Sequence, residues 1–494
     1  MVLVALLLVP VIGGAVIGLG RWRPVVAWTA VGLNGVGLAG AVALAVRVVS
    51  SGPVDGAGGL LRADPLSAFM TVVIGAVALL SSWVGVRWNT EELARGRTTA
   101  GRATGYGILV QAFIATMLLA VLAANVGILW VGVEATTIVT TFLVGHRRTR
   151  GALEASWKYI MICSVGIALA FLGTVLVYLA AVHAGVPGGH ALDWRALVAA
   201  APRMDHGVVR LGFALIVLGY GTKVGLAPSH SWLPDAHSQA PAPVSALMSG
   251  VLLTVAFTAI LRFKTVADAA LGPAFPRALL VTMALLSLAV ASSLLITQRD
   301  YKRMLAYSSI EHMGLLALGA AAGIPLAIAA VLLHILGHGL TKSVLFLSSG
   351  EILAVEGTSE IAGVRALLAR RPALGGIFGV GLLALVGLPP FSLFTSELLM
   401  ARAEFQVGLG WAAALAVGAM VVVFVAVAGH GRRMLLGVPD NPGAGPDGST
   451  GEGTRLPVSA TAPLVGGLVA CAAIGVLAWP LAPLLRAAAR VVSP

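Results

Sequence analysis

Long uninterrupted apolar segments recur along the whole chain, and they constrain the fold more than any other feature. A bilayer core about 30 Å thick requires roughly 20 apolar residues in a helix. Segments of about that length lie at 2–20, 25–48, 66–87, 104–123, 125–145, 157–182, 208–226, 243–263, 274–297, 304–323, 325–349, 373–399, 407–430 and 460–485. Because backbone polar groups find no water in lipid, such segments must form helices. The sequence therefore predicts an all-α integral membrane protein of about fourteen transmembrane helices.

Composition excludes an ordinary soluble protein. Of the 494 residues, 58% are hydrophobic and 11% are charged, whereas soluble domains carry about 25% charged residues. The formal net charge of +12 is scattered between apolar segments and forms no long basic stripe. Basic loops at a membrane surface explain this pattern better than a nucleic-acid partner does. We therefore expect a lipid bilayer around the chain and no nucleic acid.

The cysteines give no indication of a redox centre. Cys163 and Cys471 lie in apolar segments far apart, and the sequence contains no CxxC motif and no His/Cys cluster. We expect neither a disulfide framework nor an iron–sulfur site, no cofactor in this chain and no catalytic centre of its own. The first apolar segment lacks a basic start and a small-residue cleavage site, so it predicts a first span and not a signal peptide.

The basic residues of the connections predict the orientation. Connections after odd-numbered spans carry 19 of the 32 lysines and arginines, the other side carries 11, and Lys223 and Lys342 lie inside spans. Cytoplasmic loops are enriched in Lys and Arg. The bias predicts a multi-pass protein of the cell (inner) membrane with both termini outside.

Ionisable residues inside the predicted spans require an explanation, because a charge at the bilayer centre costs about 2.5–3.5 kcal/mol. Six such residues occur, of both signs and in four spans: Glu134, Lys223, His334, His338, Lys342 and Glu397. They could hold helices together as structural contacts, or they could form a pathway for protons. Their number and distribution favour the pathway.

The eleventh predicted span sharpens this interpretation. His334, His338 and Lys342 recur every four residues and so share one side of a helix. Each step rises about 6 Å, a gap that one or two waters bridge, which suits a proton relay. Two histidines four residues apart also suggest a metal site. The intervening Ile-Leu-Gly offers no glutamate and no third ligand is evident, so no metal is predicted.

Proline interrupts two of the spans. Pro228 follows Lys223 in the seventh, and Pro389 and Pro390 precede Glu397 in the twelfth. Interior proline breaks a helix, and non-helical backbone at membrane depth survives only beside protein or water. Interrupted helices in corresponding halves are typical of inverted-repeat transporters. The expected division is helices 1–3 at 1–103, a first inverted repeat (helices 4–8) at 104–263, a second (helices 9–13) at 274–431, a flexible loop at 437–459 and the last helix at 460–494.

Four stretches of the sequence resemble one known family. They read GYGTKVGLAPSHSWLPDAHSQAPAPVSALMSG, ITQRDYKRMLAYSSIEHMG, HILGHGLTKSVLFL and GLPPFSLFTSE. They closely resemble the antiporter-like membrane subunits of respiratory complex I, of group 4 nickel–iron hydrogenases and of Mrp-type cation/proton antiporters. The resemblance covers roughly residues 60–430, and ALEASWKYIMICSVGIALA resembles the hydrogenase-4 component F branch in particular.

The resemblance implies roles for individual residues. Matched positions are Glu134 in the fifth helix, Lys223 in the broken seventh, His312 in the tenth, His334, His338 and Lys342 in the eleventh, and Glu397 after the break of the twelfth. Glu134 would approach Lys223 and modulate its protonation, since two charges 4 Å apart interact by about 4 kcal/mol at an effective dielectric of 20. Several family members have a lysine in the eighth helix where this chain has Thr254. A long lateral helix after the last span, present in the distal complex I subunit, is not expected here.

The resemblance also implies partners. It predicts a proton-translocating subunit of a respiratory or hydrogenase complex, of the NADH:quinone oxidoreductase or formate hydrogenlyase kind. Other membrane-arm subunits and a redox arm would supply the energy. Two alternatives stay open: an Mrp-type cation/proton antiporter without a redox partner, and a scaffold in which the buried charges only join helices.

Overall fold

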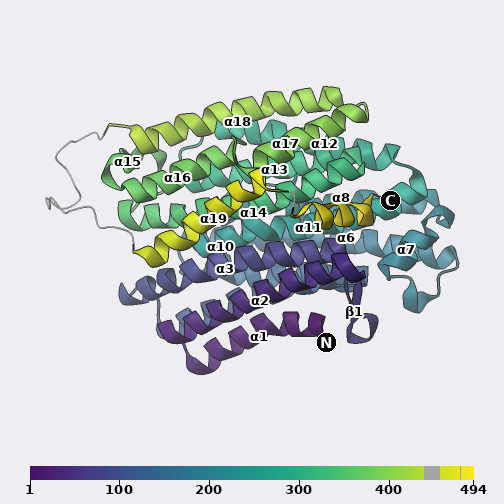
Figure 1. Ribbon diagram of the computed structural model, residues 1–494, viewed down its shortest axis with the longest axis horizontal. Helices are drawn as coiled ribbons and strands as arrows, with labels where there is room; N and C mark the ends of the chain where they lie inside the picture. Colours follow the sequence, from purple (N-terminus) through teal and green to yellow (C-terminus); the bar gives the residue numbers. More distant parts are fainter. Residues whose placement is uncertain (439–456, 479, 494) are drawn as a thin grey trace.

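The protein is a bundle of long helices whose axes run in roughly the same direction (Figure 1). The structure, a computed structural model, describes residues 1–438, 457–478 and 480–493. The helices are α1 (Val2–Gly20), α2 (Pro24–Ser51), α3 (Pro65–Ala94), α4 (Ala100–Leu122), α5 (Val126–Val144), α6 (Arg150–His183), α7 (Trp194–Ala200), α8 (His206–Val224), α9 (Trp232–Gln239), α10 (Ala242–Leu247), α11 (Leu253–Leu271), α12 (Ala274–Ile296), α13 (Tyr301–Ala322), α14 (Pro325–Glu356), α15 (Leu367–Arg370), α16 (Pro372–Leu385), α17 (Ser392–Gln406), α18 (Gly410–Leu436), α19 (Val458–Val476) and α20 (Ala482–Val492). The bundle confirms the predicted all-α membrane architecture.

Twelve helical segments in the described part of the chain are long and apolar enough to cross a membrane. The predicted spans at 304–323 and 373–399 are not among them, so the predicted number of fourteen is not confirmed. α13 occupies the first of these and contains several polar residues, and the second is divided between α16 and α17. Both regions nevertheless lie inside the bundle, beside the longer helices (Figure 1).

A small hairpin is the one departure from helix that the sequence did not indicate. β1 (Val54–Gly56) pairs antiparallel with β2 (Leu61–Ala63), with Asp55 opposite Arg62. The hairpin lies between α2 and α3 at the end of the bundle where both chain termini also lie (Figure 1). Termini at the same end are what an even number of crossings requires.

The C-terminal segment differs from the single helix predicted at 460–485. α19 ends at Val476 and a separate helix, α20, begins at Ala482. Pro480 lies in the connection, and proline can neither donate a backbone hydrogen bond nor fit within a helix interior. Most of the predicted flexible loop, 439–456, lies outside the described residues.

α14 is the central helix. It packs against α3, α10, α13, α16, α17, α19 and α20. Its most apolar stretch is completely buried, as is that of the segment Ala242–Leu271, whereas α1 and α2 are mostly exposed. The residues of α14 therefore lie between the two broken helices.

α6 and α8 approach each other closely because small residues line their contact. A Cβ atom on Gly166 would lie 2.5 Å from the Cβ of Thr222, and one on Gly219 would lie 2.4 Å from the backbone nitrogen of Ala170. Small residues of this kind let membrane helices pack backbone to backbone. The close packing places the residues of α6 directly against the end of α8.

Both interrupted spans are broken as predicted. α8 ends at Val224, where Gly225 has φ 84°, and the chain runs without helix to Trp232. The exposed carbonyl of Thr222 accepts a hydrogen bond of 2.8 Å from the Trp232 indole, so the backbone freed by the break finds a partner. The chain leaves helical geometry again between α9 and α10. There Lys302 of α13 donates hydrogen bonds to the carbonyls of Ser238 and Ala240, both at 2.9 Å.

Candidate functional site

Lys223 is completely buried in the last turn of α8. Its Nζ donates hydrogen bonds to the Thr137 hydroxyl of α5 at 2.9 Å and to the Tyr159 hydroxyl of α6 at 2.5 Å. A cation near the end of a helix also interacts favourably with the helix dipole. Trp232 packs edge-on against Tyr159, with ring centroids 4.9 Å apart, and so holds the phenol in place.

Glu134 does not contact Lys223 directly. No ion pair within 4.0 Å joins these two described residues, which differs from the approach of about 4 Å that the sequence suggested. Glu134 is half-buried on α5, and its Oε2 has no hydrogen-bond partner in the structure. Thr137 lies about one turn further along the same helix and binds Lys223. Glu134 and the hydroxyl that binds Lys223 therefore lie on the same helix, one turn apart.

The histidines and lysine of α14 all point into the bundle. His334, His338 and Lys342 have no exposed surface. Lys342 donates to the carbonyl of Leu305 at 2.8 Å and to the hydroxyl of Ser308 at 2.5 Å, both on α13. Like Lys223, it has no carboxylate within 4.0 Å among the described residues.

His312 links α13 to this row. Its Nδ1 lies 3.0 Å from Nε2 of His334, and Nδ1 of His334 lies 2.9 Å from the hydroxyl of Ser396 on α17. The rings of His312 and His338 are 5.2 Å apart between centroids. Three helices thereby contribute to one continuous row of polar groups in the second half of the chain.

Glu397 lies on α17 at the edge of this row. His312, His334 and Glu397 each offer one potential ligand atom, and the three atoms lie within 4.8 Å of one another. Glu397 also lines a cavity of about 310 Å³ between α17 and α18, together with Glu404. Gly387, with φ 67°, leaves room for the Glu397 carboxylate, since a Cβ there would lie 2.2 Å from its Oε2.

The region between the two lysines holds a buried histidine, and Thr254 occupies the start of α11. His237 of α9 is fully buried and stacks on Phe346 of α14 with ring centroids 4.8 Å apart. Phe346 is one turn beyond Lys342, so His237 belongs to the same interior. Thr254 is buried, and its hydroxyl donates to its own helix, to the carbonyl of Val251.

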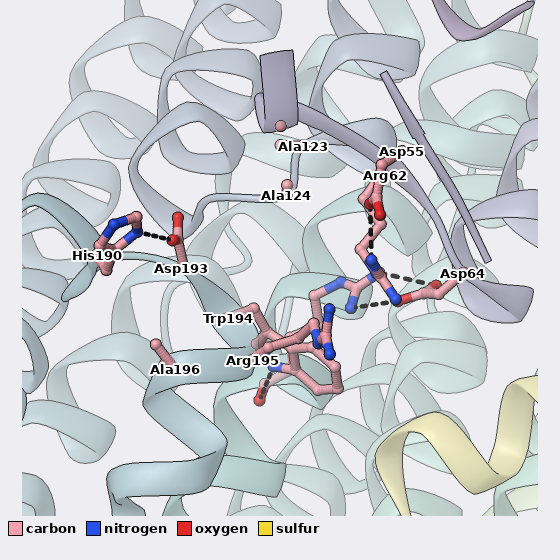
Figure 2. A pocket seen from close by; sticks show the side chains of 12 residues that line it. Asp55, Arg62, Asp64, Ala123, Ala124, His190, Asp193, Trp194, Arg195 and Ala196 are labelled. Carbon is pink, nitrogen blue, oxygen red and sulfur yellow. Dashed lines mark hydrogen bonds and ion pairs between the residues drawn. The ribbon is translucent and has the colours of Figure 1, made fainter. Parts of the chain in front are cut away.

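A different charged cluster lies near the hairpin, around a cavity of about 360 Å³ (Figure 2). Arg262 of α11 forms a buried ion pair with Asp64, with Nη1 and Oδ2 2.9 Å apart, and also binds the Ser67 hydroxyl. On the outer side, Arg62 and Asp55 form a more exposed pair at 2.6 Å. In both pairs a cation has a carboxylate partner, which distinguishes them from Lys223 and Lys342.

Sequence reasoning identified the ionisable residues but missed their partners. Thr137, Tyr159, His237, Lys302 and Glu404 were not predicted as parts of the interior polar groups. Hydroxyl residues are common in membrane helices, so Thr137 and Tyr159 carried no distinguishing pattern. Glu404, by contrast, follows Glu397 by two helical turns, and that spacing was available in the sequence.

Comparison with known families matches residues 123–423 to the family described as NADH:quinone oxidoreductase/Mrp antiporter, TM. The hydrogenase-4 component F homolog of Methylacidiphilum infernorum is 40% identical over 364 residues, which cover 74% of this chain and 76% of that protein. NADH-quinone oxidoreductase subunit N of Desulforudis audaxviator is 32% identical over 347 residues, covering 68% and 67% of the two chains.

Solved structures share the fold. A chain of the archaeal membrane-bound sulfane sulfur reductase matches with a TM-score of 0.86 and 25% identity, covering 99% of this chain and 98% of that one. A chain of respiratory complex I from Thermus thermophilus matches with a TM-score of 0.76 and 25% identity over 99% and 100% of the two chains. A chain of the Mrp complex of a Dietzia species has a TM-score of 0.83 at 22% identity, covering 99% and 96%, and shows the fold alone.

Proposed function

The chain belongs to the NADH:quinone oxidoreductase/Mrp antiporter transmembrane family, and from this membership we propose that it carries protons across the bilayer by changes in the protonation of Lys223 and Lys342. It is a proton-translocating membrane subunit, and the complexes of its relatives join such membrane subunits to a redox arm. Electron transfer in partner subunits then supplies the driving energy.

One observation carries the proposal: both central lysines are fully buried, and within residues 1–438, 457–478 and 480–493 neither has a carboxylate within 4.0 Å. A lysine that only joins helices is expected to be neutralised by an acid, because an unpaired buried charge is costly. Lys264 on α11 has such an acid partner, Asp268 one turn along the same helix, at 2.5 Å. Lys223 is bound by two hydroxyls instead, and Lys342 by a hydroxyl and a backbone carbonyl.

Hydroxyl partners suit a lysine that gains and loses a proton. A hydroxyl both donates and accepts hydrogen bonds, whereas a carboxylate only accepts. When Lys223 is protonated, it donates to Thr137 and Tyr159; when it is neutral, its lone pair accepts a hydrogen bond from one of them. Neither state leaves a buried polar group without a partner. In this scheme Lys223 is the proton carrier of the first half.

Glu134 acts on Lys223 through Thr137. Glu134 lies on α5 about one turn before Thr137, and the Thr137 hydroxyl accepts a hydrogen bond from the Lys223 ammonium. A negative charge at Glu134 favours the protonated lysine, and its neutralisation or displacement favours release. Glu134 is therefore the modulator in our proposal, and partner subunits that move α5 would change the proton affinity of Lys223.

The second half provides the relay. From Lys342 the proton would pass to His338, then to the His312–His334 pair, whose facing nitrogens are 3.0 Å apart, and finally to Glu397. A distance of 3.0 Å allows direct transfer between the two rings. The remaining gaps are wide enough to need water. Glu397 lines the cavity beside α18 and forms the exit.

The chain is a multi-pass membrane protein, and we propose that it lies in the cell (inner) membrane with both termini outside. The connection from α3 to α4 carries Arg95 and Arg97, and Arg102 lies in the first turn of α4. α3 begins beside the hairpin and runs for 30 residues, so this connection lies at the end of the bundle opposite the termini (Figure 1). Enrichment of basic residues at that end supports a cytoplasmic location for it.

An Mrp-type antiporter that works without a redox partner is the second candidate, favoured by the fold shared with the Mrp complex. The genes next to this one distinguish the two. Hydrogenase and iron–sulfur subunits would support the electron-transfer complex, and a set of small antiporter membrane subunits would support the alternative.

The test compares two buried lysines. We expect Lys223→Ala to abolish proton pumping in membrane vesicles while the complex still assembles, because no carboxylate of the described residues is bound directly to the lysine and would be left unpaired. Lys264→Ala is the matched control: it strands Asp268, so assembly should fall while pumping per assembled complex stays normal. Pumping is normalised to assembled complex on native gels. Normal pumping by Lys223→Ala would rule out its role as carrier, and parallel loss of assembly and pumping would favour the scaffold.

A further inference from the structure

We propose that His312, His334 and Glu397 form a binding site for a divalent transition-metal ion, with Zn²⁺ as the best fit. The three residues come from α13, α14 and α17, and their ligand atoms lie within 4.8 Å of one another. Two imidazoles and one carboxylate are a donor set that zinc commonly takes when it keeps a fourth position open. The three residues are far apart in the sequence, and the fold brings them together.

The facing histidine nitrogens already have nearly the spacing of two zinc ligands. Nδ1 of His312 and Nε2 of His334 are 3.0 Å apart. Two nitrogens each about 2.0–2.1 Å from a tetrahedral ion are about 3.3 Å apart. One of the two rings must donate its proton in the present hydrogen bond. When the ion binds, that ring keeps its single proton on its outer nitrogen instead, and the two facing nitrogens move apart by a few tenths of an ångström as the rings rotate toward the ion.

The outer nitrogen of His334 has an orienting partner, since its Nδ1 lies 2.9 Å from the Ser396 hydroxyl. Metal-binding histidines are usually held by such a hydrogen bond at the nitrogen that does not bind the ion. The outer nitrogen of His312, Nε2, has no hydrogen-bond partner in the structure, and Oε2 of Glu311 lies 3.6 Å from it. The bond to Ser396 holds the His334 ring with its Nε2 facing His312.

The charges around the site offset those of the ion. A dication buried at membrane depth is very costly unless negative groups lie beside it. Glu397 supplies one negative charge as a ligand, and Glu311 supplies another beside His312. With these two carboxylates the occupied site is neutral. Lys342 is two turns further along α14 and already bound to Ser308.

The cavity between α17 and α18 provides the entry route. It has a volume of about 310 Å³, and both Glu397 and Glu404 line it. The two carboxylates are seven residues apart, so they lie on one side of α17 and attract cations into the cavity. The cavity also has room for the water that would complete the coordination of the ion.

An ion at this position would block proton transfer, an effect that rests on the proposed function. It would occupy the nitrogens between which the proton passes and bind the exit carboxylate. Zinc bound at this site is therefore expected to inhibit proton transfer along the relay. Binding itself does not depend on that role and can be measured separately.

The experiment uses the purified full-length chain in detergent, with Zn²⁺ binding measured by equilibrium dialysis and with Co²⁺ as a spectroscopic probe. We expect one ion per chain and the intense visible absorption of four-coordinate Co²⁺. His334→Gln and Glu397→Gln should each weaken binding by at least about 100-fold. Ser396→Ala, which leaves all three ligands in place, should weaken it roughly 10–100-fold. His338→Gln is the matched control: this histidine is equally buried one turn along α14, and its loss should leave zinc affinity unchanged.

The outcomes separate the site from the function. No binding, or equal binding by the wild type, His334→Gln and Glu397→Gln, would overturn the metal site and leave the proposed proton pathway untouched. Loss of binding in His338→Gln but not in Ser396→Ala would also overturn it. If zinc binds as expected but does not inhibit proton pumping by the assembled complex, the metal site stands and the route through His312 and His334 is wrong.

Discussion

The buried ion pair near the hairpin allows a quantitative test of how this bundle is stabilised. Asp64 accepts a hydrogen bond of 3.1 Å from Nη2 of Arg262, and its Oδ2 lies 2.9 Å from Nη1 in the ion pair. Its Oδ1 also accepts the backbone N–H of Ser67 at 2.9 Å. Both side chains are 7% exposed. Asp64→Asn keeps an N-cap for α3, since asparagine caps as well as aspartate does. The substitution therefore removes the charge and little else.

The expected loss in the free energy of unfolding on Asp64→Asn follows from the burial of the ion pair. Removing one partner of a buried pair costs about 3–5 kcal/mol, because the other charge is left without compensation. Asp55→Asn is the control, since the Asp55–Arg62 pair lines the same cavity but its side chains are 60% and 20% exposed (Figure 2). An exposed pair of this kind contributes about 0–1 kcal/mol. The double variant Asp64→Asn/Arg262→Leu, which leaves no unpaired charge, should recover most of the loss.

The loss of stability on Asp64→Asn should also depend on pH. Burial by itself would raise the pKa of Asp64, but the charge of Arg262 and the hydrogen bonds from Arg262 and Ser67 outweigh it and lower the pKa below its ordinary value. A carboxylate with a lowered folded-state pKa stabilises the protein above its unfolded pKa of about 3.9, and this contribution is lost as the pH falls through the folded-state pKa. The difference between wild type and Asp64→Asn should thus be full at pH 7 and shrink only in acid below about pH 4.

The assay is unfolding in mixed detergent micelles on titration with SDS, followed by circular dichroism. A loss below 1 kcal/mol for Asp64→Asn at pH 7, equal to that of Asp55→Asn, would refute the argument from burial. So would a double variant that is less stable than Asp64→Asn alone.

Two further predictions concern the site and the topology. Tyr159→Phe removes one of the two hydroxyls that bind Lys223, and a hydrogen bond to a charged group contributes about 1.5–3 kcal/mol, so proton pumping per assembled complex should fall at least roughly tenfold; unchanged pumping would show that the phenol is not needed. A C-terminal reporter that works only outside the cytoplasm should be active, and activity of a cytoplasm-only reporter would reverse the proposed orientation.

The membrane spans were the most predictable part of the fold. The apolar segment at 25–48 corresponds to α2 at Pro24–Ser51, because a helix in lipid must continue until its backbone reaches water. α13 was harder to count, since its polar residues face the protein interior and lower its apparent hydrophobicity. The end of α19 depended on Pro480, whose effect a count of apolar residues does not include.

The candidate site was predictable only in its ionisable members. A lysine or histidine in a lipid-spanning segment is costly enough to stand out in the sequence, as Lys223 and His334 do. The residues that bind them could not be inferred, because packing brings them from far along the chain. Thr137 is 86 residues from Lys223, and Ser396 is 62 residues from His334. For the same reason, the sequence did not group His312 and Glu397 with His334 as potential metal ligands.

The hydroxyl partners of Lys223 have a consequence for the speed of the protein. An ion pair must separate when one of its members is neutralised, and the surrounding helices must then relax around the stranded charge. Rotation of the Thr137 and Tyr159 O–H bonds needs no heavy atom to move. The reorganisation energy of each protonation change is correspondingly small, as in other preorganised polar sites. On the proposed function, proton occupancy at Lys223 would then respond to the electrostatic state of neighbouring subunits with little rearrangement of the helices around it.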